Sequence, residues 1–151
     1  MANHQPVRPR RGEIWFVRMP SGPSDKGARP VVVVSLDARN QHPRASTVLV
    51  VPLSTSLRGV GTHIRLEPGE TGLPEACEAQ AENISSVRKE SLNLPRSPLR
   101  TISGTRLRQI AQCVVLAMGI LPGELQVETQ RHGGTEKSAE VLSSSVSQWR
   151  T

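Results

Sequence analysis

The residues in this sequence best suited to chemistry are an arginine and a serine that their spacing brings together. Arg29 precedes the run Val31–Val34, and Ser54 ends a second strand-like run that begins at Thr47. In an antiparallel hairpin, the numbers of opposed residues have a constant sum, which closing the hairpin between Leu36 and Thr47 would fix. The same sum places Arg29 opposite Ser54, with Cβ atoms about 5 Å apart. The spacing therefore predicts a phosphate-gripping guanidinium beside a hydroxyl, unless a bulge shifts the register.

Other titratable residues are weaker candidates. His63 has the chemistry of a general base, but the alternation of residues 62–67 places it on the polar face of a strand. This favours an ordinary exposed histidine. Glu78 and Glu82 could form an acid pair, yet alternation places both on one polar face beside Gln80. Solvated carboxylates are therefore favoured.

No group of residues predicts a metal or a cofactor. The histidines, cysteines and carboxylates lack the spacing of metal-ligand motifs, and Cys77 and Cys113 are expected to be free buried thiols. Gly59 and Gly61 lack the strand-then-helix context of a phosphate-binding loop. Any chemistry would therefore depend on protein side chains alone.

Short strands must position these residues. The four valines Val31–Val34 are β-branched and have no polar break, which favours an interior strand. Residues 12–19 predict a first strand that carries Trp15 and Phe16 into the core. Two polar segments, residues 20–28 and 54–61, connect strands. The first could be a simple hairpin connection or one wall of a site. Further strands are expected at 47–53, 62–67, 76–82 and 99–102.

One helix is expected late in the chain. From Thr105 to Met118 the apolar residues have helical spacing, with Ser103 as the N-cap and Gly119 as a stop signal. By length the chain holds one domain. We expect a flexible basic arm at 1–10, a folded domain at 11–120 and a disordered tail at 121–151.

Composition makes a polyanionic partner plausible. The 151 residues carry a net charge of +6, and arginine supplies nearly all of the positive charge. Arginine grips phosphate and stacks on bases, although a merely basic surface would look the same. No apolar run approaches the roughly 20 residues that cross a bilayer, and the start of the chain lacks the apolar core of a signal peptide. The cytoplasm is the expected location, with no membrane partner.

Several motifs in order resemble one known family. They are RGEIWFV, a glycine-bearing loop that ends in RPVVVVS, a strand that ends in VVPLS, then THIRL, GLP and CEAQAENISSV. Together, from residue 11 to about 119, they resemble the MazF/PemK family of toxin endoribonucleases. The resemblance implies a mainly β fold, a small SH3-like antiparallel barrel of the CcdB/PemK type with one C-terminal helix.

The resemblance also implies an activity and partners. Members are toxins of type II toxin–antitoxin systems that cleave single-stranded RNA at specific sequences without a metal, through attack by the 2′-hydroxyl. Their partners are the RNA, a second copy in a homodimer, and a cognate antitoxin whose flexible acidic segment wraps the toxin. The sequence leaves open two alternatives, a non-catalytic topoisomerase poison resembling CcdB and a basic nucleic-acid-binding module.

The family's catalytic arginine falls on Arg29 and its catalytic threonine on Ser54, where serine keeps the hydroxyl. Arginine stays protonated, so the general base remains open. Two departures from the family pattern affect the substrate contacts: PSDKGAR replaces the usual G-S-E loop, and the usual E-Q-I-R reads Glu82, Asn83, Ile84, Ser85. The candidate substrate-binding residues are Asp25, Lys26, Thr55, His63, Gln80 and Asn83.

Overall fold

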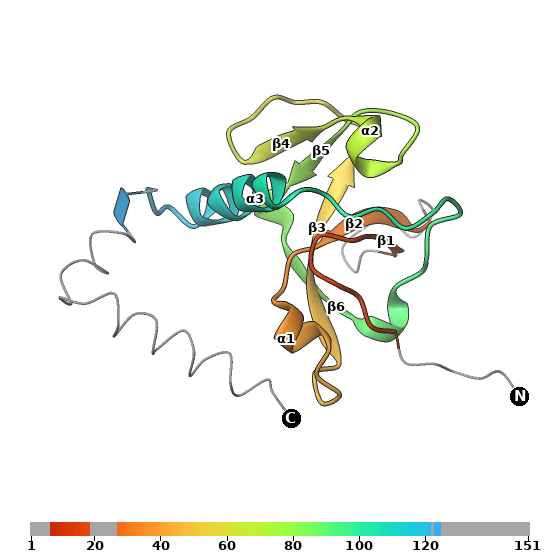
Figure 1. Cartoon of the computed structure of the whole chain (residues 1–151). Helices are drawn as coiled ribbons and strands as arrows, with labels where there is room; N and C mark the ends of the chain where they lie inside the picture. The colour runs from red at the N-terminus through yellow and green to blue at the C-terminus, as the bar shows by residue number, and fades with distance from the viewer. Residues whose placement is uncertain (1–6, 19–26, 122, 125–151) are drawn as a thin grey trace, which may run out of the picture.

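The computed structural model describes residues 7–18, 27–121 and 123–124. In these residues a bent antiparallel sheet carries one long helix (Figure 1). Strand order is β1-β2-β3-β5-β4, with β6 also pairing with β3, so the sheet does not close on itself. The strands are β1 (Ile14–Val17), β2 (Arg29–Val33), β3 (Thr47–Ser54), β4 (His63–Leu66), β5 (Cys77–Gln80) and β6 (Ser85–Arg88).

Short helical turns connect these strands. They are α1 (Asp37–Asn40), α2 (Pro68–Thr71), η2 (Ala81–Asn83) and η3 (Lys89–Ser91). The long helix α3 (Gly104–Ala117) begins where the sequence predicted, because the Ser103 hydroxyl accepts a hydrogen bond from the Arg106 amide. It ends before Gly119, which has the left-handed φ of 84° that glycine adopts most easily. In the segment 99–102, only the bridge between Glu13 and Thr101 forms in place of the predicted strand.

Strand β3 organises the sheet because it is shared between partners. Residues 47–50 of β3 pair with β6 and residues 50–52 pair with β2, while its last two residues, Leu53 and Ser54, pair with Ala79 and Glu78 of β5. The chain therefore changes partner within one eight-residue strand. This change bends the sheet at Ser54, where β2 and β5 diverge.

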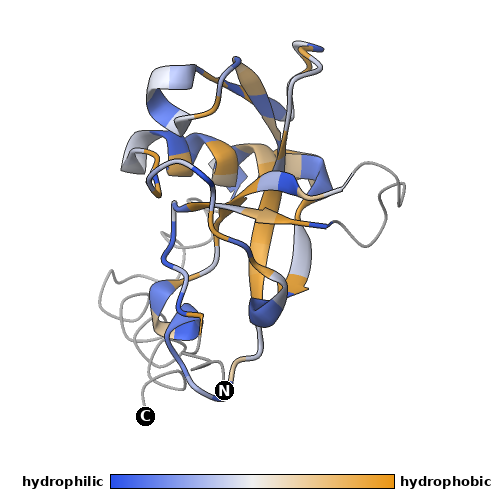
Figure 2. Ribbon diagram, turned by 90° about the vertical axis from the view of Figure 1, so that its right-hand side faces the viewer, coloured by the Kyte–Doolittle hydropathy of each residue, from blue (hydrophilic) through white to orange (hydrophobic). Residues whose placement is uncertain are grey.

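The core lies on both faces of β2, as the unbroken valine run predicted. Val32 packs in one cluster with Ile110 of α3, whereas Val31 and Val33 pack in a second cluster with Trp15. All three valines are fully buried. The ribbon coloured by hydropathy shows the apolar segments concentrated in these central strands (Figure 2). A two-sided core holds β2, and with it Arg29, in a fixed frame.

The ends of the chain are described only in part. At the start, Pro9 is fully buried and accepts a hydrogen bond from Gln41, while Val7 packs against the second cluster. Residues 7–10 of the predicted basic arm therefore contact the folded domain. The predicted tail lies almost entirely outside the described residues, apart from Leu121, Gly123 and Glu124. Cys77 and Cys113 are free and buried, as predicted.

Candidate active site

Arg29 and Ser54 line the same hollow, a basin of about 710 Å³ at the bend of the sheet. Its floor and walls come from the ends of β1, β2, β3 and β5 and from the loop before β5. The lining residues are Phe16, Arg29, Pro30, Leu53, Ser54, Thr55, Ser56, Leu73, Pro74, Glu75 and Cys77.

The strand register explains why the arginine and the serine meet. Val31 pairs with Pro52, Val32 with Val51 and Val33 with Val50, which is the register predicted from the sequence. Continued by two residues, it would set Arg29 opposite Ser54. The ladder stops at Val31, because Pro30 has no N–H to donate and β3 turns towards β5. The two side chains therefore face an opening between diverging strands.

Arg29 is half-buried, yet its side chain forms no hydrogen bond or ion pair with any described residue. Its backbone is fixed, since it pairs with Val17 of β1. A guanidinium carries five N–H donors in a planar fork that matches two phosphate oxygens. Arg29 is thus a cation held at the base of a basin with its donors available to a ligand.

Ser54 has a directed hydroxyl. Its Oγ accepts a hydrogen bond of 3.1 Å from the Ser56 amide, a short turn at the end of β3. The acceptor side of the oxygen is therefore engaged, while its own O–H hydrogen remains available to donate. Together with Arg29, this gives the basin donors that suit an anionic oxygen.

Several lining residues were not among the residues singled out from the sequence. Phe16 was predicted to lie in the core with Trp15, but it is only half-buried and presents its ring to the basin. Glu75 adds an exposed carboxylate from the loop before β5. Burial raises the pKa of the Cys77 thiol to about 11, so at neutral pH this lining group is uncharged. No sequence spacing connects these residues to Arg29, because the bend of β3 creates their proximity.

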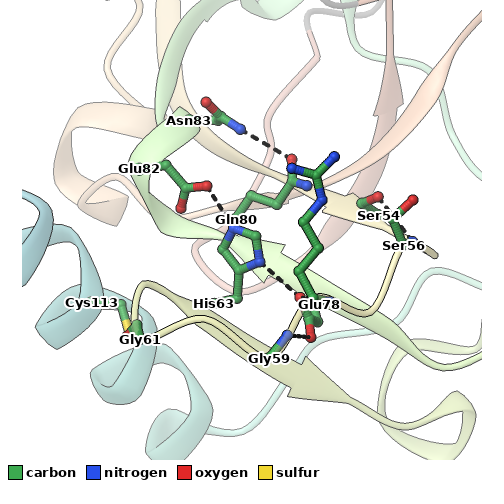
Figure 3. A network of polar contacts seen from close by, with 11 residues as sticks. Ser54, Ser56, Gly59, Gly61, His63, Glu78, Gln80, Glu82, Asn83 and Cys113 are labelled. Carbon is green, nitrogen blue, oxygen red and sulfur yellow. Dashed lines mark hydrogen bonds and ion pairs between the residues drawn. The ribbon is translucent and has the colours of Figure 1, made fainter.

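The six predicted substrate-binding residues separate into three groups. Thr55 lines the basin. Asp25 and Lys26 lie outside the described residues. His63, Gln80 and Asn83 are not among the residues that line the basin and belong to a different set of contacts (Figure 3). There Asn83 donates to the side-chain oxygen of Gln80 at 3.1 Å.

The prediction that His63 is an exposed histidine was wrong. Its side chain is only 3% exposed and lies between two carboxylates: Nδ1 is 2.7 Å from Glu78 Oε2, and Nε2 is 2.5 Å from Glu82 Oε1. Strand alternation assumed one open face of β4. In the fold, η2 packs against β4, and the carboxylates of Glu78 and Glu82 cover His63, whereas Arg65 on the same face of β4 remains 58% exposed. We refer to His63, Glu78 and Glu82 as the histidine bridge.

The prediction of a solvated Glu78 was also wrong, whereas Glu82 remains 37% exposed. The Glu78 side chain is 5% exposed and accepts hydrogen bonds from two backbone amides, Gly59 at 2.8 Å and Arg58 at 3.1 Å. These amide bonds, and the contact with His63, outweigh burial and lower the pKa of Glu78. The carboxylate is therefore ionised and fully engaged within the protein.

Neither a metal site nor a membrane-spanning helix is found in the described residues. Within residues 7–18, 27–121 and 123–124, no three histidine, cysteine or acidic side chains are grouped to hold a metal ion. None of the helices in this part of the chain is long and apolar enough to cross a membrane.

Comparison with known proteins identifies the family. A family model described as "PemK-like, MazF-like toxin of type II toxin-antitoxin system" matches residues 10–118. The chain is 34% identical over 110 residues to a probable endoribonuclease MazF5 of Mycobacterium tuberculosis, covering 73% of this chain and 93% of that protein. It is 32% identical over 117 residues to endoribonuclease MazF9 of the same organism, covering 74% and 97%.

Solved structures agree with these relatives. A mycobacterial endoribonuclease superposes with a TM-score of 0.59 at 26% identity, over 76% of this chain and 94% of that one. A mycobacterial endoribonuclease solved in complex with its cognate antitoxin gives a TM-score of 0.59 at 25% identity, over 74% and 96%. The predicted fold of a mainly antiparallel sheet with a C-terminal helix is confirmed. This chain belongs to the PemK-like, MazF-like toxin family of type II toxin–antitoxin systems.

Proposed function

We propose that the endoribonuclease activity of this MazF-type toxin resides in the basin at the bend of the sheet, with Arg29 and Ser54 as its catalytic residues. One observation carries the proposal. Both side chains line a single basin, Arg29 with its donors uncommitted and Ser54 with a hydroxyl hydrogen to give. The Arg29 donors are open to solvent, so a phosphate can bind them without breaking any contact among the described residues.

The chemistry is cleavage of RNA by its own ribose. The 2′-oxygen attacks the adjacent phosphorus and forms a new P–O bond, while the bond to the 5′-oxygen of the next nucleotide breaks. The products are a 2′,3′-cyclic phosphate and a free 5′-hydroxyl. Arg29 offsets the negative charge that develops on the phosphoryl oxygens and donates a proton to the leaving oxygen, and water at once returns that proton to the strongly basic guanidine. Ser54 holds a phosphoryl oxygen through its hydroxyl hydrogen.

The proton of the attacking hydroxyl must go to a separate base. Arg29 stays protonated and cannot accept it, and the Cys77 thiol, with a pKa of about 11, is not a thiolate at neutral pH. Among the described residues that line the basin, Glu75 carries the carboxylate. Glu75 is therefore the first residue to test as the base.

A second hollow supports an extended single strand as the substrate. A groove of about 560 Å³ adjoins the basin and shares Phe16, Leu73 and Pro74 with it. Arg96 lines this groove, exposed and without a hydrogen bond or ion pair to the described residues. A cation in each of two adjoining, partly apolar hollows suits two phosphates of one strand with unstacked bases. Such a substrate, messenger RNA, places the action in the cytoplasm.

The partners are a second copy of the chain and an antitoxin. Apolar side chains are exposed on the loop between β3 and β4, at the end of α3 and just after it, which suits a homodimer contact: Leu57, Val60, Leu116, Met118 and Leu121. Arg29, Arg96 and a net charge of +6 suit a flexible acidic segment of an antitoxin that covers the site. The mycobacterial relative solved with its cognate antitoxin supports this partner.

The test is to incubate the purified protein with a long single-stranded RNA in EDTA and to map the ends. We expect cuts at a recurring short sequence, each leaving a cyclic phosphate and a 5′-hydroxyl. An RNA with a 2′-deoxy nucleotide at the cut position should bind but resist cleavage there. Cleavage that needs a divalent metal, or that survives the 2′-deoxy substitution, would overturn the mechanism.

A further inference from the structure

The histidine bridge lies beside the candidate site. Ser54 and Glu78 are paired across β3 and β5, so their side chains leave the same face of the sheet from neighbouring positions. The side chain of Glu78 does not line the basin and instead reaches the loop formed by residues 55–61. Figure 3 shows Glu78 between His63 and the Gly59 amide, with Ser54 and Ser56 close by.

The contacts of Glu78 with this loop are specific. Its two oxygens accept from consecutive amides, Oε2 from Arg58 at 3.1 Å and Oε1 from Gly59 at 2.8 Å. Gly59 has a φ of 64°, the left-handed conformation that turns consecutive amides towards one acceptor. The loop is otherwise exposed from Thr55 to Gly61. The carboxylate therefore fixes a loop that has little packing of its own.

This loop forms part of the candidate site. Thr55 and Ser56 line the basin, and the Ser56 amide sets the direction of the Ser54 hydroxyl. Three residues separate Ser54 from the pinned amide of Arg58. We propose that Glu78 is a positioning residue for RNA cleavage: it pins the peptide between Arg58 and Gly59, and thereby fixes the turn that aims Ser54. The cleavage part of this inference rests on the proposed function.

His63 and Glu82 are the other two members of the histidine bridge. The Nδ1 of His63 contacts the same Glu78 oxygen that accepts from Arg58, and Nε2 contacts Glu82. An imidazolium donates from both nitrogens, so it balances two carboxylates at once. The other charged or titratable side chains that line the hollow beside His63 are Arg65, Glu67, Arg106 and Cys113. Glu82 touches the histidine but not the loop, which makes it the matched control.

Limited proteolysis measures how firmly Glu78 holds the loop, without any RNA. Trypsin cuts after arginine, and the bond after Arg58 is the one whose amide Glu78 holds. In the folded full-length chain, Glu78→Gln weakens a charged hydrogen bond to that amide and should speed cleavage there about tenfold. Glu82→Gln should stay within about twofold of the parent. Unchanged cleavage after Arg58 in Glu78→Gln would overturn the proposal.

RNA cleavage by the same proteins tests the positioning role. Glu78→Gln should lower kcat about tenfold with little change in KM, because Ser54 is misaimed but the basin is intact. Glu82→Gln should keep the parental kcat. A looser loop with an unchanged kcat would overturn the positioning role. A parent protein that cuts no RNA would instead overturn the proposed function itself, so the two failures are distinct.

A second substitution at the same position tests whether misfolding explains the cleavage. If Glu78→Gln is cut throughout the chain, Glu78→Asp keeps the charge beside His63 but withdraws the carboxylate from the loop by one methylene. It should show the same selective cleavage after Arg58, with exposed Arg65 as the reference bond. General cleavage in both variants would show that Glu78 supports the whole fold and does not position the loop, and would overturn the proposal.

Discussion

The candidate site and the histidine bridge lie side by side across β3 and β5, and they treat polar groups in opposite ways. In the basin, Arg29 has no partner among the described residues, and Ser54 retains a hydrogen to donate. In the bridge, Glu78 is engaged by two amides and an imidazole. Unused donors at a solvent-filled opening await a ligand, whereas buried polar groups must be paired within the protein. The difference separates side chains that are available to bind a substrate from side chains that stabilise the protein.

The largest effect should come from the unpaired cation. Replacing Arg29 with alanine removes the electrostatic donor of the proposed reaction, which typically costs about two to three decades in rate. The thermal midpoint should hardly change, because the side chain has no partner to lose among the described residues. RNA cleavage and a thermal melt measure the two quantities.

Arg58 supplies the control for this experiment. Its side chain is exposed and does not line the basin, and Arg58→Ala keeps the backbone amide that Glu78 holds. It should lose far less activity than Arg29→Ala. Equal losses in the two variants would indicate that general positive charge, and not a placed guanidinium, drives cleavage.

A smaller loss is expected at Ser54. Ser54→Ala removes one hydrogen bond to a charged oxygen, worth about 1.5–3 kcal/mol, so cleavage should fall by about one to two decades. Ser54→Thr keeps the hydroxyl and should retain most of the activity. Comparing kcat for the two variants measures the effect. An alanine variant as active as the threonine variant would remove Ser54 from the mechanism.

The sequence predicted the basin better than the bridge, for a physical reason. The register between β2 and β3 is a local property, since it follows from closing the hairpin between Leu36 and Thr47. It brought Arg29 to Ser54 without any knowledge of the rest of the fold. The burial of His63 depends instead on Glu78 and Glu82, which β5 and η2 bring beside it from 15 and 19 residues later in the chain. Alternation within residues 62–67 carries no information about elements that cover its polar face.

The bridge should stabilise the protein within a limited pH range. Partial burial lowers the pKa of His63, but hydrogen bonds and charge attraction from Glu82 and Glu78 outweigh it and raise the pKa above 6.5. A raised histidine pKa stabilises the fold below pH 6.5, and this stabilisation is lost as the pH rises through the folded-state pKa. Stabilisation by Glu78 and Glu82, whose pKa values are lowered, is lost as the pH falls below 4.5.

The parent and His63→Gln should therefore differ most in thermal midpoint between about pH 4.5 and 6.5, and converge at higher pH. Glutamine is uncharged and cannot donate to both carboxylates at once. Melting both proteins from pH 4 to pH 9 in one buffer series measures the difference. A gap that widens at alkaline pH would mean that the histidine is neutral in the folded protein.

The smallest effect is expected at an ion pair that resembles the bridge only in joining a cationic side chain to a carboxylate. Arg88 and Glu90 approach to 2.8 Å, but their side chains are 70% and 72% exposed. Water screens such a pair, and fixing two long side chains costs entropy, so exposed pairs contribute less than about 1 kcal/mol. Arg88→Ala should change the unfolding free energy by no more than that in a urea titration, at any pH from 5 to 8. If it destabilised the protein as much as His63→Gln does at pH 5.5, charge pairing alone would account for both, and burial would not distinguish the bridge from the surface.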